Sequence, residues 1–479
     1  MAPTNAGTTV TATDDHIILI GAGCAAFMNM LDSTIVTVSL PTMIHDLSVD
    51  TELGIAVPLA YIIMLAGTVL MFGRIADRYG MRRVMIAGFA LFSASSLVCG
   101  LAPDLLVLVI GRLIQGIGGG MLSATSLGAI GYYLPHGSRG TGIGIVSAAS
   151  ALGATLGSPL GGILSEVLGW RWIFLVNIPV GVLALWIVTC RFPADPDYGA
   201  GSRPAVPDIS SVLLCIATLT IFLVTLSRGP EMGWFSPVII GGGAISVVLL
   251  YIFLVHERNS SDPLLDPDLF RDRRFCLANL ANVFTLMLVG GFLFLMPFYL
   301  IIVSGQGQAA TGGILLLFSG VYILVSPMTG WLSDRIGNRT LTTGGMALAV
   351  PALALAAAMA GSTALIFPVV LLILMGIAYG TYLSPNIRQI LHLAPDEKQG
   401  AASGIVRFFI YIGQPIGVVL VELVIRAGIP ADMMTTAGPV NSAAFQDGFI
   451  VCCVLAALSA GCSFLAGFFT AQGKLSEFR

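Results

Sequence analysis

Charged side chains are scarce in this sequence. Asp, Glu, Lys and Arg together make up 10% of its 479 residues, whereas soluble domains carry about a quarter. So small a share excludes a globular domain with a water-solvated surface. The formal net charge of −3 also argues against nucleic acid as a partner, because binding a polyanion requires Lys and Arg clustered on a solvated face.

Residues suited to metal or covalent chemistry are also few. The five His lie outside the interiors of the apolar runs, and the eight Cys show neither zinc-ligand spacing nor a disulfide framework. A Gly-rich nucleotide loop ending in Lys-Ser or Lys-Thr does not occur. We therefore expect no metal, no cofactor and no use of ATP, and a membrane-embedded enzyme remains only a remote alternative.

Apolar residues, in contrast, form 56% of the chain. Fourteen membrane spans of about 20 residues each would need close to this number of residues. The apolar runs form one group of six within 17–191, two runs within 208–256 and another group of six within 274–470. This pattern predicts an all-α polytopic membrane protein with fourteen spans. Because the first sixteen residues lack Lys and Arg, we expect the first run to be a retained helix rather than a signal peptide.

The distribution of Lys and Arg supports this count independently, because cytoplasmic loops of membrane proteins are enriched in positive charge. With both termini placed inside, seventeen of the 22 basic residues fall in inside loops and three fall outside. Only Arg112 and Arg407 lie within spans. We therefore expect a protein of the plasma (inner) membrane whose terminal segments, 1–16 and 471–479, are cytoplasmic.

The sequence repeats itself at an offset of nearly 260 residues. Gly73–Arg82 matches Gly330–Arg339 at five of ten positions at an offset of 257, and several further Gly and Pro recur at an offset of 260. Such parallel repeats occur in transporters whose substrate site lies near the midplane between two halves. We therefore expect 17–191 and 274–470 to be two six-helix halves, with 208–256 as two inserted linker helices.

Five short motifs occur in order along the chain: Leu31–Val36, Gly73–Arg83, Gly111–Gly116, Gly153–Gly162 and Asp262–Phe270. Together they resemble the major facilitator superfamily, in particular its fourteen-span drug/proton antiporter branch. The resemblance covers nearly the whole chain. It implies a monomer with the major facilitator fold that exports small molecules by antiport against protons.

Asp32 is the most informative residue, because an ionised carboxylate inside a span costs about 2.5 to 3.5 kcal/mol on insertion scales. Asp32 lies eight residues from the outer end of its span and Arg112 eight residues from the outer start of its own. At about 1.5 Å per residue both reach roughly the same depth. We therefore predict an Asp32–Arg112 ion pair that couples protons to transport. The alternative is a permanent pair that only orients two helices.

Two further charged residues are candidates of a different kind. Glu422 is expected near the outer boundary, either as an interfacial anchor or as a second protonation or cation-attracting site. Arg407 is expected to bind an anionic group or line a hydrated cavity, or else to extend toward the inner interface.

The repeated loop motifs predict a gate at the cytoplasmic side. Asp77 and Asp334 lie at short turns, where each could cap a helix N-terminus of the opposite half. The resemblance implies that this contact closes the inner gate, with arginines as charge partners. The predicted gate residues are Gly73, Asp77, Arg78, Gly80, Arg82, Asp334 and Arg335.

Two sets of residues complete the predicted sites. Glycines on one helix, together with a proline, predict close packing and a bend in the antiporter-type helix: Gly153, Gly157, Pro159, Gly161 and Gly162. Polar and aromatic residues predict a cavity for lipophilic cations: Gln115, Phe292, Tyr299, Tyr382, Asn386, Arg407, Tyr411 and Gln414.

The sequence thus predicts a proton-coupled exporter of amphipathic or lipophilic, cationic small molecules that works by alternating access. Its partners would be the substrate, protons and the lipid bilayer. The main alternative is an exporter dedicated to one metabolite or lipid, since it would share every motif.

Overall fold

The computed structural model describes residues 12–195, 208–260, 263–428 and 442–476, and within these ranges the ordered elements are all helical. Fourteen of the helices are long and apolar enough to cross a membrane, which confirms the predicted all-α architecture and the number of spans. Helices that are apolar all round, as most of these are, are expected inside a membrane or a large core.

The first half of the chain forms six long and two short helices. Their bounds are α1 (Ala12–Asp46), α2 (Thr51–Gly54), α3 (Ala56–Tyr79), α4 (Met81–Gly100), α5 (Leu105–Tyr133), α6 (Arg139–Val167), α7 (Trp172–Leu175) and α8 (Asn177–Arg191).

Three helices connect the halves, and the second half follows. The connecting helices are α9 (Ile209–Met232), α10 (Pro237–Asn259) and the short α11 (Pro267–Arg271). The second half contains α12 (Arg273–Phe298) with the π-helical turn η1 (Tyr299–Val303), α13 (Gln308–Ile336), α14 (Asn338–Ala358), α15 (Ile366–Leu393), η2 (Asp396–Lys398), α16 (Gln399–Gly428) and α17 (Ser442–Ser476).

Two helices extend beyond their predicted ends. α1 begins at Ala12, inside the segment 1–16 expected to precede the first span, and continues to Asp46. α17 reaches Ser476, inside the segment 471–479 expected to follow the last span. Hydropathy marks where an apolar run ends, whereas backbone hydrogen bonds continue a helix through polar residues.

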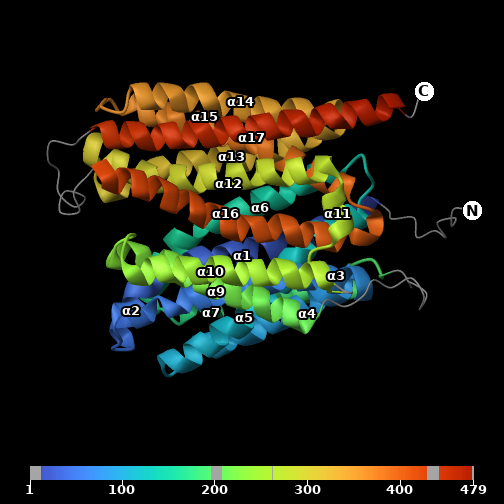
Figure 1. Ribbon diagram of the computed structural model, residues 1–479. Helices are drawn as coiled ribbons and strands as arrows, with labels where there is room; N and C mark the ends of the chain where they lie inside the picture. The colour runs from blue at the N-terminus through green and yellow to red at the C-terminus, as the bar shows by residue number, and fades with distance from the viewer. Residues whose placement is uncertain (1–11, 196–207, 261–262, 429–441, 477–479) are drawn as a thin grey trace, which may run out of the picture.

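The two halves lie side by side along their whole length, and α9 and α10 lie across one face (Figure 1). α9 packs against α3. α10 buries only four of its side chains, those of Ile239, Ser246, Phe253 and Glu257, so most of its apolar surface is free to face lipid.

Contacts between the halves follow the internal repeat. α3 and α13 occupy equivalent places in the two halves, as do α6 and α16. α3 packs against α16 and α6 packs against α13. We call the end of the bundle at which α11 lies the closed end, and the opposite end, at which α2 lies, the open end (Figure 1).

Candidate functional site

The predicted pair of Asp32 and Arg112 is present in the first half. Asp32 lies on α1 and Arg112 on α5, and Arg112 Nη1 lies 2.5 Å from Asp32 Oδ2. Both residues are fully buried, with 0% exposure. Removing two charges from water costs several kcal/mol per ion, so such a pair persists only where further hydrogen bonds surround it.

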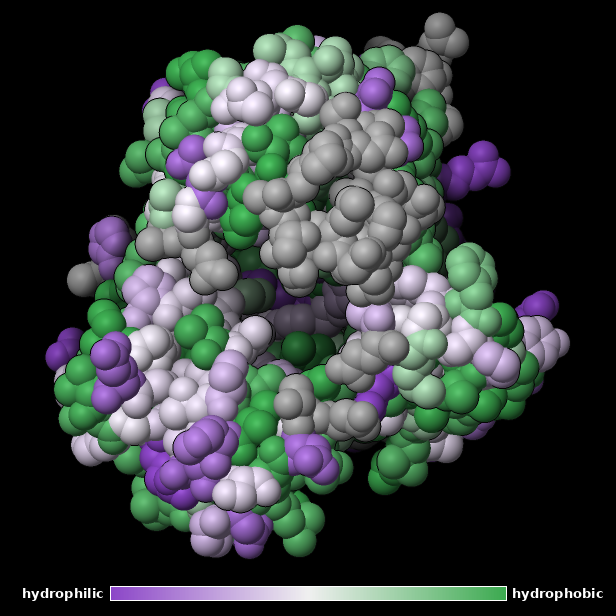
Figure 2. Space-filling model, turned by 90° about the vertical axis from the view of Figure 1, so that its left-hand side faces the viewer, coloured by the Kyte–Doolittle hydropathy of each residue, from purple (hydrophilic) through white to green (hydrophobic). Residues whose placement is uncertain are grey.

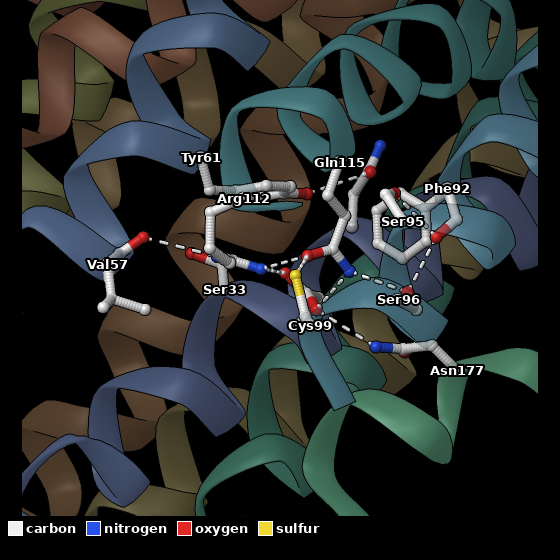
Figure 3. A network of polar contacts seen from close by, with 12 residues as sticks. Ser33, Val57, Tyr61, Phe92, Ser95, Ser96, Cys99, Arg112, Gln115 and Asn177 are labelled. Atoms are coloured by element: carbon white, nitrogen blue, oxygen red, sulfur yellow. Dashed lines mark hydrogen bonds and ion pairs between the residues drawn. The ribbon is translucent and has the colours of Figure 1, made fainter. Parts of the chain in front are cut away.

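Two amides provide these hydrogen bonds to the carboxylate (Figure 3). Gln115 Nε2 on α5 and Asn177 Nδ2 on α8 each donate to Asp32 Oδ1 at 3.0 Å. Gln115 also accepts from Arg112 at 2.6 Å and donates to Ser96 Oγ on α4 at 2.8 Å. Side chains of four helices in one half therefore form a single network around this carboxylate.

The guanidinium of Arg112 is enclosed on its remaining sides. Its Nε donates to the carbonyl oxygen of Val57 at 3.3 Å. The ring of Tyr61 lies 4.2 Å from the guanidinium carbon, and the ring of Phe174 lies at 5.6 Å. Asp32 thus accepts from three donors, Arg112, Gln115 and Asn177. Protonation would neutralise the carboxylate and weaken these charge-assisted hydrogen bonds, which join α1 to α5 and α8.

Some members of this network were not predicted from the sequence. Gln115, predicted as a substrate-cavity residue, is fully buried and donates to Asp32. Its spacing of three residues from Arg112, which places both side chains on one helix face, was the available signal. Asn177 and Ser96 were not assigned a role, although Asn177 is a buried polar side chain at the start of an apolar helix.

The closed end is built from two equivalent caps. Asp77 accepts hydrogen bonds from the backbone N–H groups of Gly400 and Ala401, at 2.6 and 2.8 Å. Asp334 accepts from the backbone N–H groups of Gly140 and Thr141, both at 2.9 Å. Each carboxylate thus lies at the N-terminal end of a helix of the opposite half, where unpaired N–H groups favour an anion.

Glycines allow the backbones to meet beside these caps. A Cβ atom added to Gly73 would overlap the carbonyl oxygen of Gly400, and one added to Gly330 would overlap that of Gly140. Two further ion pairs lie here: Arg388 with Asp334 at 2.9 Å and Arg139 with Asp396 at 3.1 Å. The closed end is therefore sealed by main chain and by polar contacts between the halves.

The three predicted gate arginines have the following contacts. Arg82 donates within its own half, to the carbonyl oxygens of Val188 at 3.3 Å and Thr189 at 2.6 Å, so it holds α4 to α8. The guanidinium of Arg78 lies 5.4 Å from the ring of Tyr79, and that of Arg335 lies 3.8 Å from the ring of Trp331.

Gly80 joins α3 to α4 with a φ of 105°, a conformation that favours glycine. The turn is fixed by Asp195, which the sequence did not single out. Its carboxylate accepts from the backbone N–H groups of Arg82 and Arg83 at 3.0 and 3.2 Å, and from Tyr133 Oη at 2.6 Å.

Three of the five residues predicted for the antiporter-type helix pack α6 against α1. Added Cβ atoms at Gly153, Gly157 and Gly161 would meet the carbonyl oxygen of Phe27, the side chain of Thr34 and the carbonyl oxygen of Ile35. The other two do not belong to this face: Pro159 is exposed, and a Cβ at Gly162 would meet nothing within 4 Å. Neighbouring residues on a helix point about 100° apart, so Gly162 cannot share the face of Gly161.

A cavity of about 160 Å³ lies between the halves. It is lined by α1 and α6 of the first half and by α12, α13, α15 and α16 of the second: Met30, Ser147, Ser150, Ala151, Ala154, Val289, Leu293, Phe318, Ser319, Tyr322, Tyr379, Leu383, Ile387, Arg407, Ile410 and Gln414. Seen from the open end, the molecule is hollowed between its halves (Figure 2). The position fits a transporter site at the interface of two repeats.

Among the eight predicted cavity residues, Arg407 and Gln414 line this cavity. Tyr411 instead forms a hydrogen bond with Ser123 of the other half at 2.9 Å. Three of the rest lie inside the second half: Phe292 is buried beside Phe318, Tyr299 donates to the carbonyl oxygen of Ser362 at 2.8 Å, and Asn386 donates to that of Ala278 at 3.2 Å. Tyr382 is also fully buried. The aromatic rings among them pack well in any apolar surroundings, so their presence in the sequence does not distinguish a core position from a cavity lining.

Glu422 is 5% exposed on α16, so it is buried rather than placed on a solvated interface. In the described ranges, groups of three or more His, Cys, Asp or Glu side chains that could hold a metal ion are not found.

Comparisons with known proteins agree with this architecture. The family model described as Major Facilitator Superfamily matches residues 22–418. Multidrug resistance protein Stp of Mycobacterium tuberculosis (strain CDC 1551 / Oshkosh) is 34% identical over 420 residues, which cover 87% of this chain and 77% of Stp.

Two other proteins extend the comparison. Riboflavin transporter RibZ of Clostridioides difficile (strain 630) is 28% identical over 387 residues, covering 80% of this chain and 82% of RibZ. The crystal structure of the human organic anion transporter MFSD10 superposes with a TM-score of 0.64 at 16% identity, covering 92% of this chain and 99% of that one. At this identity the likeness to MFSD10 concerns the fold alone.

Proposed function

The chain belongs to the major facilitator superfamily, and from that premise we propose that it is a proton-coupled exporter of amphipathic or lipophilic small molecules that works by alternating access. Membership of the family and its fourteen candidate spans make it an integral membrane transporter of small-molecule substrates rather than an enzyme. The relative named a multidrug resistance protein supports export of lipophilic compounds.

The observation that carries proton coupling is the Asp32 site. A fully buried carboxylate with three donors from α5 and α8 is costly to bury, and intramembrane acids commonly form proton relays. The equivalent positions in the second half are Phe292 and Leu372, so a buried Asp–Arg pair of this kind belongs to the first half alone. The side chains with which the second half lines the cavity can then be suited to the substrate alone.

The two caps support alternating access. We propose that the closed end faces the cytoplasm, in accord with the bias of Lys and Arg, and that the hollow seen from the open end faces outward. Export then requires the Asp77 and Asp334 caps to separate while the open end closes. Rocking of one six-helix half against the other provides this motion.

The proposed substrate range does not keep the restriction to cations that the sequence suggested. The cavity described above contains one charged lining side chain, the cation Arg407, which does not favour the cationic substrates predicted from the sequence. The relative named a riboflavin transporter favours the second candidate, an exporter dedicated to one metabolite. Competition between chemically unrelated compounds in one transport assay would separate the two readings, since a dedicated exporter would be inhibited by close analogues alone.

Proton coupling is tested in proteoliposomes that contain the purified full-length chain and a trapped pH dye. Adding a panel of anionic, neutral and cationic compounds should produce proton movement with at least one of them. Asp32→Asn should abolish that movement and the uptake driven by a pH gradient while leaving downhill exchange of the same compound. Gradient-driven uptake retained by Asp32→Asn would remove Asp32 from the coupling role.

A further inference from the structure

Arg407 differs from Arg112, which is also buried inside a span, in how its charge is balanced. Arg112 has a carboxylate at 2.5 Å, an amide oxygen and a main-chain carbonyl around it. Arg407 is also buried, at 5% exposure, but its hydrogen bond goes to a neutral group, Ser126 Oγ, at 3.0 Å. Over the described ranges, the ion pairs between acidic and basic side chains do not include Arg407.

Its guanidinium also retains unused donor capacity. Nε of Arg407 is buried without a hydrogen-bond partner. Ser150, which also lines the cavity, has an Oγ that is likewise buried without a hydrogen-bond partner. A guanidinium carries five N–H donors in a rigid fork that matches a carboxylate or phosphate. A buried charge without a counter-ion is costly. An anionic group entering the cavity would therefore pair with the charge of Arg407 and accept a hydrogen bond from its free donor.

The wall beside Arg407 is aromatic. Tyr322, Tyr379 and Phe318 line the cavity with it. The rings of Tyr322 and Tyr379 lie 4.9 Å apart, and Phe318 stacks on Tyr379 with an angle of 22° between the ring planes. Planar or aliphatic apolar groups pack well against such rings. The cavity therefore combines a flat apolar wall with one fixed positive charge.

We propose that this cavity selects lipophilic organic anions, with the acidic group of the substrate bound by Arg407 and its apolar body lying against Phe318, Tyr322 and Tyr379. This inference rests on the proposed function only in taking the cavity as the substrate site; it does not depend on proton coupling. It replaces the cationic substrate class predicted from the sequence with the opposite charge.

The test uses three probes with one aromatic body: 2-naphthylacetate as the anion, 2-(2-naphthyl)ethanol as the neutral compound and 2-(2-naphthyl)ethylamine as the cation. Equilibrium dialysis against the full-length protein in detergent at neutral pH, with empty micelles as the blank, measures each affinity. The anion should bind on the order of tenfold tighter than the other two, since charge-assisted bidentate bonds exceed neutral ones.

Variants assign the preference to Arg407. Arg407→Gln should weaken binding of the anion by about tenfold and leave the neutral probe within about twofold, whereas Arg407→Lys should retain part of the preference. Arg271→Gln is the matched control, because it removes the same charge from a side chain that is 82% exposed at the closed end. Its three affinities should equal those of the wild type.

Several results would overturn the proposal. These are equal binding of the three probes, tighter binding of the amine, no binding of any probe, or a preference for the anion that survives Arg407→Gln. Unchanged binding of the neutral probe shows that Arg407→Gln is folded. The two proposals can fail separately because dialysis needs no pH gradient. If Asp32→Asn loses coupling but the wild type shows no preference for the anion, only the present inference is rejected. If the wild type prefers the anion but Asp32→Asn retains gradient-driven uptake, only the role of Asp32 in proton coupling is rejected.

Discussion

Asp77 and Asp334 occupy equivalent places at the closed end, and each accepts two backbone hydrogen bonds from the first turn of a helix in the other half. The relationship is reciprocal, since the first half provides one carboxylate and the second half provides the other. Closure therefore depends on two caps that bridge the interface in opposite directions.

Removing either cap should loosen the closed end locally. Asp77→Asn replaces charged acceptors with one neutral oxygen, which should cost about 1 to 2 kcal/mol because hydrogen bonds to charged groups are the stronger kind. Hydrogen–deuterium exchange followed by mass spectrometry should show faster exchange at Gly400 and Ala401. Asp334→Asn should do the same at Gly140 and Thr141 and serves as the reciprocal control. Unchanged exchange in both variants would contradict the gating role of the carboxylates.

The Asp32–Arg112 pair should be coupled energetically. Arg112→Gln leaves a buried carboxylate without its counter-charge, a loss expected to cost about 3 to 5 kcal/mol. Asp32→Asn combined with Arg112→Gln removes both charges, so the double variant should be more stable than Arg112→Gln alone. Thermal unfolding midpoints of the purified proteins in one detergent measure this. A double variant as unstable as the sum of the single changes would show that the pair contributes no mutual interaction.

Asn177 should act as a positioning residue for Asp32. Asn177→Leu removes one of the three donors to the carboxylate, so gradient-driven uptake should fall by about tenfold while downhill exchange persists. Asn386→Leu provides the matched control, because Asn386 is an equally buried amide of the second half that donates to a backbone carbonyl. Equal effects of the two variants on gradient-driven uptake would assign Asn177 a purely structural role.

The contact of α6 with α1 can be tested by a pair of glycines on one helix. Gly157→Ala would place a methyl group against the side chain of Thr34 and 3.1 Å from the backbone nitrogen of Ile35, and overpacking of this kind costs about 1 to 3 kcal/mol. Gly162→Ala meets open space and should leave stability unchanged or slightly raised. The thermal midpoints should therefore separate the two variants, and a destabilised Gly162→Ala would contradict the observed packing.

Several features of the fold follow from the sequence through simple physics. Span number depends on the length of apolar runs, which the bilayer thickness fixes. Asp32 and Arg112 could be paired because depth follows from counting residues along two helices. The caps could be placed because the repeat puts Asp77 and Asp334 at matching turns.

Most of the residues predicted for the substrate cavity do not line the cavity between the halves. Phe292 and Tyr299 are apolar aromatic residues in apolar helices, and nothing in their neighbours along the chain distinguishes a core position from a lining position. Asp195 was missed for a related reason. Its partners Arg82 and Tyr133 are 113 and 62 residues away in the sequence. Such contacts depend on how each helix is rotated about its own axis, and a helix that is apolar all round does not define that rotation.

The glycine contacts at the closed end carry a consequence for the order in which the contacts there break. Where Gly73 meets Gly400 and Gly140 meets Gly330, main chain faces main chain, and glycine has no side chain that could maintain contact as the halves part. Hydrogen bonds of 2.6 to 2.9 Å are lost once donor and acceptor separate by about a further ångström. The longer side chain of Arg139, which pairs with Asp396 of the other half, can follow a larger displacement. We therefore expect the two caps to break first and this ion pair to break last as the closed end opens.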